Sequence, residues 1–183
     1  MHTYISILRG INVSGRNMIK MEALRSMYEA LDFKDVKTYI QSGNVVFRTK
    51  KTSNHKLEKK IAEKITEIFS YDVPVMVKEL DEIADVLENN PFVNKRKEDI
   101  TKLHVTFLSH EPEHSFLDKI KDLKYASDEF ILFGKNVYLF CPDGYGNTKL
   151  SNNFFESKLK VTATTRNWKT INELMVLGKS VAE

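Results

Sequence analysis

The sequence has little of what marks secreted or membrane proteins. Its 183 residues contain one cysteine, Cys141, which excludes an intramolecular disulfide framework. The longest apolar runs, such as residues 130–133, are far shorter than the ~20 residues that cross a bilayer. Residues 1–9 lack the basic start and long apolar centre of a signal peptide. We therefore expect a cytoplasmic protein that does not associate with membranes.

The chain has no strong excess of either charge. It carries 28 basic and 25 acidic side chains, a net charge of +3, and its pI is about 8.8. Domains that hold nucleic acid by its phosphates usually have a pI above ~9 and clustered Lys and Arg. The balance found here permits an anionic partner without requiring one. The hydrophobic fraction of 42% is that of a globular protein with a core.

Motifs of nucleotide binding are missing. Gly10 and Gly15 are too far apart for the dinucleotide-binding fingerprint. Residues 143–150 contain two glycines and a lysine, but Thr148 precedes Lys149, so the spacing of a phosphate-binding P-loop is absent.

Catalytic and metal-binding patterns are missing too, since no paired carboxylates and no Ser-His-Asp arrangement can be identified from spacing. His110 and His114 are four residues apart, but Pro112 breaks the helix that would align them on a metal ion. Cys141 has no base placed near it and is predicted to be a buried, inert thiol. We predict no metal ion and no cofactor, and the sequence identifies no catalytic residue.

The apolar periodicity predicts two successive units with the same order of elements. In the first, strand, helix, strand, strand, helix and strand are expected at residues 3–8, 21–31, 36–41, 44–48, 57–69 and 74–77. In the second, the same order is expected at residues 104–109, 113–123, 129–133, 137–141, 152–159 and 161–165. Further helices are expected at residues 81–89 and from Trp168 onward.

This order predicts the α+β class, with two tandem ferredoxin-like βαββαβ subdomains, antiparallel sheets, a linking helix and a C-terminal helix. The expected boundaries are residues 1–79 for the first subdomain, 80–102 for the linking helix and linker, and 103–183 for the second subdomain.

The predicted topology gathers unusual residues at one sheet end in each unit. A helix crosses over between the first and second strands, so these strands are parallel and the segments that follow them emerge together. In the first unit, this places together Arg9, Asn12, Arg16, Asn17, Gln41, Ser42 and Asn44. In the second unit, the segments after the third and fourth strands share the opposite end and place together Asp143, Tyr145, Asn147, Thr148, Lys149, Arg166 and Asn167.

Each group has a structural and a functional interpretation. Residues 143–150 precede a predicted helix, so they form either an anion site at its amino terminus or a turn capped by Ser151 or Asn152. Arg9, at the end of a strand, needs either a structural partner or a ligand. Trp168 either stacks on a ring or belongs to the core.

Several segments resemble one bacterial family. They are Leu8-Arg-Gly-Ile-Asn12, Thr38-Tyr-Ile-Gln-Ser-Gly-Asn-Val-Val-Phe47, Asn90-Pro-Phe92, His104-Val-Thr-Phe-Leu108, Pro142-Asp-Gly-Tyr-Gly146, Lys149-Leu150 and Ala163-Thr-Thr-Arg-Asn-Trp168. In this order, along nearly the whole chain, they are similar to the motifs of the bacterial domain-of-unknown-function family 1697. The resemblance implies paired ferredoxin-like subdomains and supplies no catalytic residues. Its motifs coincide with the two groups of loop residues.

Three functions are compatible with these features. We favour a module that binds a phosphate-bearing ligand, nucleic acid or nucleotide, with Arg9, Arg16, Lys149, Arg166 and Lys169 on phosphates and Tyr145 or Trp168 stacking on a base. The first alternative is an enzyme for a small anionic metabolite in a cleft between the subdomains, with Asp143 or Tyr145 as acid–base group. The second is a protein–protein adaptor that uses exposed sheet edges.

Overall fold

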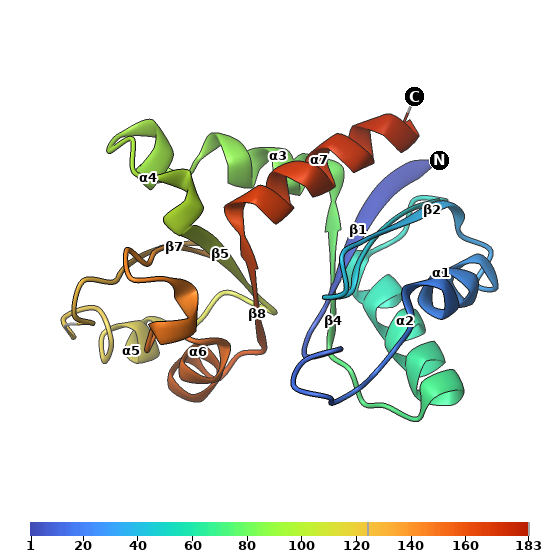
Figure 1. The fold of residues 1–183 in the computed structure, drawn as a ribbon, viewed down its shortest axis with the longest axis horizontal. Coiled ribbons are helices and arrows are strands. Elements are labelled where there is room, and N and C mark those ends of the chain that lie inside the picture. The colour runs from blue at the N-terminus through green and yellow to red at the C-terminus, as the bar shows by residue number, and fades with distance from the viewer. Residues whose placement is uncertain (124, 183) are drawn as a thin grey trace. The chain divides into compact units, whose positions relative to one another are not determined.

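The computed structural model describes residues 1–123 and 125–182, and these fold into two four-stranded antiparallel sheets with helices (Figure 1). By its internal contacts the chain divides into two units. Unit 1 contains Met1–Asp85 and the chain from Glu173 onward, and unit 2 contains Val86–Asn172. The predicted second subdomain includes residues 124 and 183, which lie outside the described residues. The boundaries predicted from the sequence, residues 1–79, 80–102 and 103–183, stay a prediction of which segments form subdomains.

Unit 1 has the predicted order of elements. They are β1 (His2–Leu8), α1 (Met21–Glu29), β2 (Lys34–Tyr39), β3 (Asn44–Thr49), α2 (Asn54–Phe69), β4 (Val75–Glu79) and α3 (Leu80–Glu88). The strand order in the sheet is β2-β3-β1-β4. With β1 between β3 and β4 and antiparallel to both, this is the ferredoxin-like arrangement that the sequence predicted.

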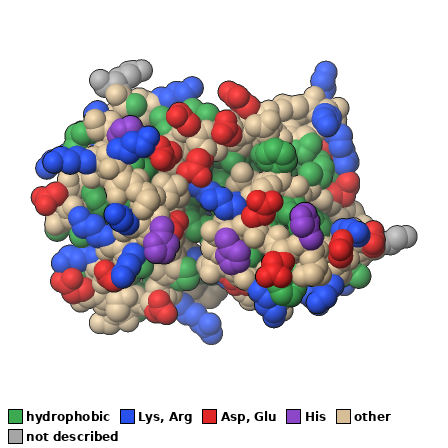
Figure 2. All heavy atoms as spheres, turned by 180° about the vertical axis from the view of Figure 1, so that it is seen from behind, with side chains coloured by type: hydrophobic (Ala, Val, Ile, Leu, Met, Phe, Trp, Pro, Cys, Tyr) green, Lys and Arg blue, Asp and Glu red, His purple; other side chains and the backbone are tan. Residues whose placement is uncertain are grey.

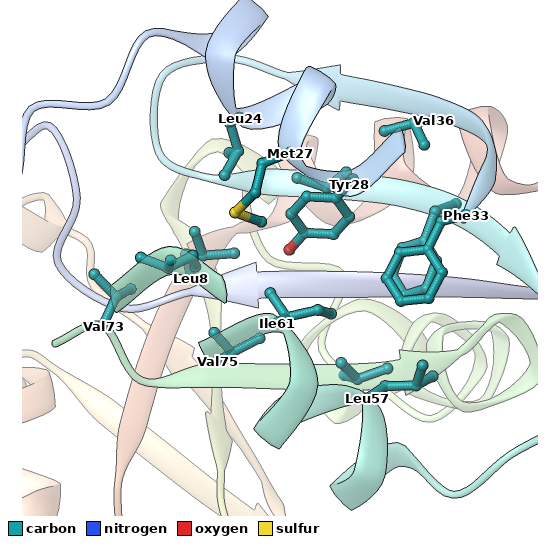
Figure 3. Packing of buried hydrophobic residues seen from close by; sticks show 14 of the residues in the cluster. Leu8, Leu24, Met27, Tyr28, Phe33, Val36, Leu57, Ile61, Val73 and Val75 are labelled. Carbon is teal, nitrogen blue, oxygen red and sulfur yellow. The ribbon is translucent and has the colours of Figure 1, made fainter. Parts of the chain in front are cut away.

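The core of unit 1 lies between the sheet and helices α1 and α2 (Figure 3). Leu57, Ile61 and Ile65 recur on one face of α2 and are buried, as the helical period requires. Tyr28 of α1 is also fully buried, and its hydroxyl shares a 2.7 Å hydrogen bond with Ser6 Oγ on β1. That bond satisfies two polar groups that would otherwise be costly inside the core.

The opposite face of the same sheet packs against α3 and the C-terminal part of α7 (Trp168–Ala182). Ile5 and Ile7 of β1 are fully buried on this face. Gly178 lets α7 approach closely, because its backbone lies against the side chains of Leu80 and Ile5. The C-terminal helix therefore contributes to the core of unit 1.

Unit 2 repeats the topology. Its elements are α4 (Pro91–Asn94), β5 (Leu103–Leu108), α5 (His114–Leu117), β6 (Glu129–Phe133), β7 (Asn136–Phe140), α6 (Asn152–Leu159) and β8 (Ala163–Asn167), with short 3-10 turns at Ile100–Lys102 and Tyr145–Asn147. The strand order is β6-β7-β5-β8. Helices α5 and α6 cover one sheet face over a core that includes Leu139, Phe155 and Leu159.

The other face of this sheet is covered in part by the segment around α4. The rings of Phe92 and Phe140 lie 5.9 Å apart, and the Arg96 guanidinium lies over both. Tyr138 Oη donates a 3.2 Å hydrogen bond to the Val86 carbonyl. The sequence had placed this segment in a linker and gave no sign of α4.

One predicted helix is wrong in its length. The helix expected at residues 113–123 is only one turn, α5, and the chain continues in irregular turns. Tyr125 Oη donates to the Ile120 carbonyl at 3.0 Å, which satisfies that carbonyl outside a helix. Ile120 is fully buried, as its apolar spacing indicated, but it lies in a turn and not in the predicted helix.

Candidate functional site

The first group of loop residues lies at one end of the unit 1 sheet, and we call residues 9–20 and 40–43 the loop group. Leu8 N donates to Gly43 O at 2.9 Å, and Arg9 N donates to Pro74 O at 2.9 Å. Gly43 has a φ of +76°, and a Cβ there would lie 2.7 Å from Ile11 Cδ1 and 2.8 Å from Leu8 Cβ. Only glycine fits this position, so the two loops pack directly on each other.

Asn12 connects the two loops. Its Nδ2 donates to Ile19 O and to Gln41 O, both at 2.9 Å, and its Oδ1 accepts from Ile19 N at 2.8 Å. Asn17 Nδ2 donates to Gly10 O at 3.0 Å, which closes the first loop on itself. Both amides, which the sequence predicted as ligand contacts, bond to backbone groups of the two loops.

Asn44 and Ser42 fix the hairpin between β2 and β3. Asn44 is fully buried, and its Nδ2 donates to Tyr39 O at 3.1 Å and to Ser42 Oγ at 2.9 Å. Both side chains therefore have partners within the hairpin.

Left-handed backbone is concentrated in the loop group. Asn12, Ser14, Asn17 and Ile40 have φ between 47° and 53°. Asparagine tolerates this conformation, but a β-branched isoleucine rarely adopts it, and Ile40 is also 49% exposed. Such strain persists only where the surroundings hold it, and it is frequent at functional sites.

The cations of the loop group differ in exposure. Arg9 is half-buried and has an interaction within the protein. Arg16 and Lys20 are exposed, as is Gln41, and their side chains make no hydrogen bond or ion pair with any described residue. Of the residues predicted here, Arg16 and Gln41 are thus available to a ligand, and Lys20 joins them.

Lys20 occupies the N-cap position of α1, where its side chain makes no capping hydrogen bond. A residue with a side-chain acceptor usually stands there, because it can bond to the first free N–H groups of the helix. Lysine offers no acceptor, and its charge is unfavourable beside the positive end of the helix dipole. The first turn of α1 therefore has no cap from Lys20, and it contains one carboxylate, Glu22.

The second group lies where the topology predicted, at the sheet end that holds the start of β5. Leu103 pairs with Phe140 at the end of β7, and His104 pairs with Asn167 at the end of β8. The ring of Tyr145 stacks on His104 with centroids 4.8 Å apart. This contact ties the loop after β7 to the sheet and was not predicted from the sequence.

Most polar side chains of the second group also hold the backbone. Asp143 Oδ2 accepts from Ser127 Oγ at 2.6 Å, and Asn147 Nδ2 donates to Asp143 O at 3.0 Å. Thr148 Oγ1 accepts from Leu150 N at 3.0 Å. Lys149 is exposed and makes no hydrogen bond or ion pair with any described residue.

The end of β8 has structural roles as well. Arg166 Nη1 donates to Thr164 Oγ1 at 3.1 Å and to Thr165 O at 2.9 Å. Asn167 Oδ1 accepts from Thr170 N at 2.7 Å and so caps α7. Trp168 is only 6% exposed, so its ring is part of the core.

Helix α6 carries the cap that the sequence suggested. Ser151 Oγ accepts from Phe154 N at 3.3 Å, so the amino terminus of α6 already has an acceptor from the protein. This is the geometry expected if residues 143–150 form a turn that leads into a helix capped by Ser151.

Burial shifts the pKa values of two side chains near the second group, His104 and Cys141. It lowers the pKa of His104 below the usual value, although a hydrogen bond with the Lys102 backbone acts in the opposite direction. The Nδ1 atom of the same ring is buried and has no hydrogen-bond partner among the described residues. Burial raises the pKa of the Cys141 thiol to about 11. Within the described residues, no three His, Cys, Asp or Glu side chains are close enough to hold a metal ion.

Over the face shown in Figure 2, Lys and Arg side chains are interspersed with Asp and Glu. Among the described residues no helix combines the length and apolar composition needed to span a bilayer.

Comparison with known proteins assigns a family. Residues 1–138 match the model of a family described as "Protein of unknown function (DUF1697)". The chain belongs to this family. A conserved bacterial protein from Streptococcus pneumoniae is similar in structure, with a TM-score of 0.67 and 24% identity over 97% of this chain and 98% of that one. At that identity, the likeness shows a shared fold. No curated protein matches the sequence.

Proposed function

We propose that the loop group of unit 1 binds a phosphate-bearing ligand, either a nucleotide or a nucleic acid. The observation that carries the proposal is the amino terminus of α1, where Lys20 offers no cap and Arg16 extends from the preceding loop. Free N–H groups at the positive end of a helix favour an anion. A bound phosphate would accept hydrogen bonds from them and neutralise both cations.

The rigidity of the loop group supports this proposal. Asn12, Asn17 and Gly43 hold the two loops against each other through side-chain bonds and close packing. A ligand would therefore meet a preformed surface and would not need to order a flexible loop. The left-handed Ile40 beside exposed Gln41 is a strained feature of the kind found at binding sites.

Unit 2 offers further exposed cations. Lys149 and Lys169 are exposed, and Tyr145 is partly exposed while stacked on His104. A nucleic acid, which is long enough to reach several surfaces, would use these cations in addition to the loop group. A nucleotide would need the loop group alone.

Equilibrium titrations can separate the two ligand classes. A labelled single-stranded oligonucleotide should bind with a log affinity that falls against log salt, with a slope of about −2.8 if the four cations Arg16, Lys20, Lys149 and Lys169 contact phosphates. ATP or inorganic pyrophosphate should compete if the loop group recognises the phosphate itself. Absence of binding by the oligonucleotide, ATP and pyrophosphate at low salt would contradict the proposal.

Variants then locate the site. Arg16→Ala should weaken oligonucleotide binding and make the salt slope shallower by about 0.7, because one phosphate contact is lost. Arg25→Ala is the matched control, since Arg25 is also exposed in unit 1 and makes only an exposed ion pair with Glu29. Equal effects of the two variants would indicate general electrostatic attraction rather than a site.

A further inference from the structure

The loop group of unit 1 exposes three aliphatic side chains, which we call the aliphatic patch. Val13 is 57% exposed, Met18 is 59% exposed and Ile40 is 49% exposed. Two other aliphatic residues of the same loop, Ile11 and Ile19, are buried in the core. The loop is therefore anchored by one set of aliphatic side chains and presents another set to solvent. A single exposed aliphatic residue is ordinary, whereas several that lie together mark a contact surface.

The side chain of Asn12 brings the three positions of the patch together. Its amide bonds to the N–H and the carbonyl of Ile19 and to the Gln41 carbonyl. Each residue of the patch is the direct neighbour in the chain of Asn12 or of one of these two partners. The neighbouring pairs are Asn12 with Val13, Met18 with Ile19, and Ile40 with Gln41. The patch therefore belongs to one rigid surface and not to three separate loops.

The charge beside the patch has one sign. Residues 9–20 and 40–43 contain three cations, Arg9, Arg16 and Lys20, and no aspartate or glutamate. Arg16 and Lys20 are exposed, and their side chains make no hydrogen bond or ion pair with any described residue. Such a surface is complementary to an anion that also carries apolar surface.

Gln41 adds a neutral hydrogen-bonding group at the edge of the patch. Its side chain is exposed, makes no hydrogen bond with any described residue and follows Ile40 directly. A glutamine amide offers both a donor and an acceptor, and this pair suits the edge of a nucleobase. The apolar core of a lipid layer would leave the same amide without partners. The neighbourhood of the patch therefore favours bases over acyl chains.

We propose that, among phosphate-bearing ligands, the loop group selects single-stranded nucleic acid, with unpaired bases on the aliphatic patch. This inference rests on the proposed function, because Arg16 and Lys20 contact the phosphates. Aliphatic side chains such as isoleucine and methionine pack against bases that are unstacked. A single strand exposes such bases, whereas a duplex keeps its base faces stacked inside. A mononucleotide brings one base only and covers less of the patch.

A comparison of single strand and duplex tests the selection. The full chain is titrated at one salt concentration with a labelled single strand of about 12 nucleotides and with its duplex. Phosphate contacts alone would favour the duplex, because its charge density is higher. We expect the single strand to bind about tenfold more tightly, because only its bases reach the patch. Equal or tighter binding of the duplex would overturn this inference and leave the phosphate site standing. Failure of both nucleic acids and pyrophosphate to bind would contradict the proposed function as well.

A matched pair of variants locates the contact. Ile40→Asn should weaken single-strand binding by about fivefold, because roughly half of an isoleucine side chain loses its apolar contact. Asparagine tolerates the left-handed backbone at this position, so the variant should remain folded. The salt slope should not change, since the lost contact carries no charge, whereas Arg16→Ala makes the slope shallower. Ile68→Asn is the control, because Ile68 is 48% exposed on α2, outside the loop group. Equal affinities of the two isoleucine variants would overturn the proposal.

Sedimentation with vesicles of phosphatidylserine and phosphatidylcholine tests the competing occupant, an anionic lipid surface. We expect the full chain to remain in the supernatant. Sedimentation with the vesicles that is lost in Ile40→Asn and kept in Ile68→Asn would show that the aliphatic patch enters lipid. That result would overturn its assignment to bases.

Discussion

Asn12 joins the loop after β1 to the hairpin between β2 and β3, because its Nδ2 donates to the Gln41 carbonyl at 2.9 Å. The same side chain bonds to both the N–H and the carbonyl of Ile19. One half-buried amide thus sets the distance between the two loops of the proposed site.

Asn12→Ala should lower the free energy of unfolding by about 1–3 kcal/mol, because backbone groups lose their partners and alanine tolerates the left-handed conformation poorly. Asn12→Gly is the matched control, since it keeps the conformation and removes only the side-chain bonds. Urea denaturation of both variants measures the two contributions. If Asn12→Gly were as stable as the wild type, the amide bonds would not hold the loops.

Gly43 offers a second comparison. Gly43→Ala should cost about 1–3 kcal/mol more than Gly15→Ala, because a Cβ at 43 would lie 2.7 Å from Ile11 Cδ1 whereas a Cβ at 15 meets no atom within 4 Å. The two glycines have nearly equal φ, +76° and +74°, so the penalty for left-handed backbone cancels in the comparison. Equal losses of stability on thermal unfolding would show that the loops can separate at little cost.

Lys20→Ser should move stability and binding in opposite directions. Serine supplies the missing N-cap acceptor of α1 and should stabilise the protein by about 1 kcal/mol. The same substitution removes a cation and occupies the N–H groups proposed to meet phosphate, so affinity should fall. Thermal unfolding and oligonucleotide titration measure the two effects. Stabilisation without any loss of affinity would assign the amino terminus of α1 a purely structural role.

Glu82 makes the stability of unit 1 depend on pH. Burial opposes its ionisation, but Lys78, the Glu79 N–H and Asn54 together hold the pKa of Glu82 below the usual value of 4.5. The ionised carboxylate therefore stabilises the folded state above pH ~4.5, and this contribution is lost as the pH falls through the lower folded-state pKa. Because Glu82 is 36% exposed, solvent screening limits the contribution to about 1 kcal/mol.

Glu82→Gln should lower stability at neutral pH and flatten its decline between pH 5 and pH 3. Denaturation midpoints across this pH range provide the measurement. Glu63→Gln is the control, since Glu63 is exposed on α2 and its ion pair with Lys59 spans 3.9 Å. A decline equally steep in Glu82→Gln and in the wild type would assign the acid sensitivity to other carboxylates.

The fold was largely predictable because its periodic segments are long and regular. The apolar face of α2 and the short apolar runs of β6 and β7 on either side of Gly134 gave their types and approximate ends. The short helix α4 and the end of α5 were not predictable, since the ring of Phe92 packs against Phe140 and the ring of Tyr125 against Phe154, which are distant in the sequence. No local pattern encodes such contacts.

For the candidate site, topology predicted which loops meet but not what their side chains do. The asparagines and Arg166 looked like ligand contacts, yet an asparagine in a tight loop satisfies backbone groups equally well, and spacing cannot tell the two apart. The left-handed Ile40 was unforeseen, because isoleucine normally indicates a strand. Lys20 carried a usable signal, since a lysine directly before a helix that lacks a capping residue is unfavourable.

The central claim is that the loop group of unit 1 binds phosphate. Its most direct test is a titration of the isotope-labelled wild-type chain with pyrophosphate, and then with a short oligonucleotide, while backbone amide shifts are followed by NMR. We predict that the largest saturable shifts occur in residues 16–23 and 40–43 and that they disappear in Arg16→Glu but persist in Arg25→Glu. Shifts that are absent, or that occur elsewhere and are insensitive to Arg16, would contradict the account.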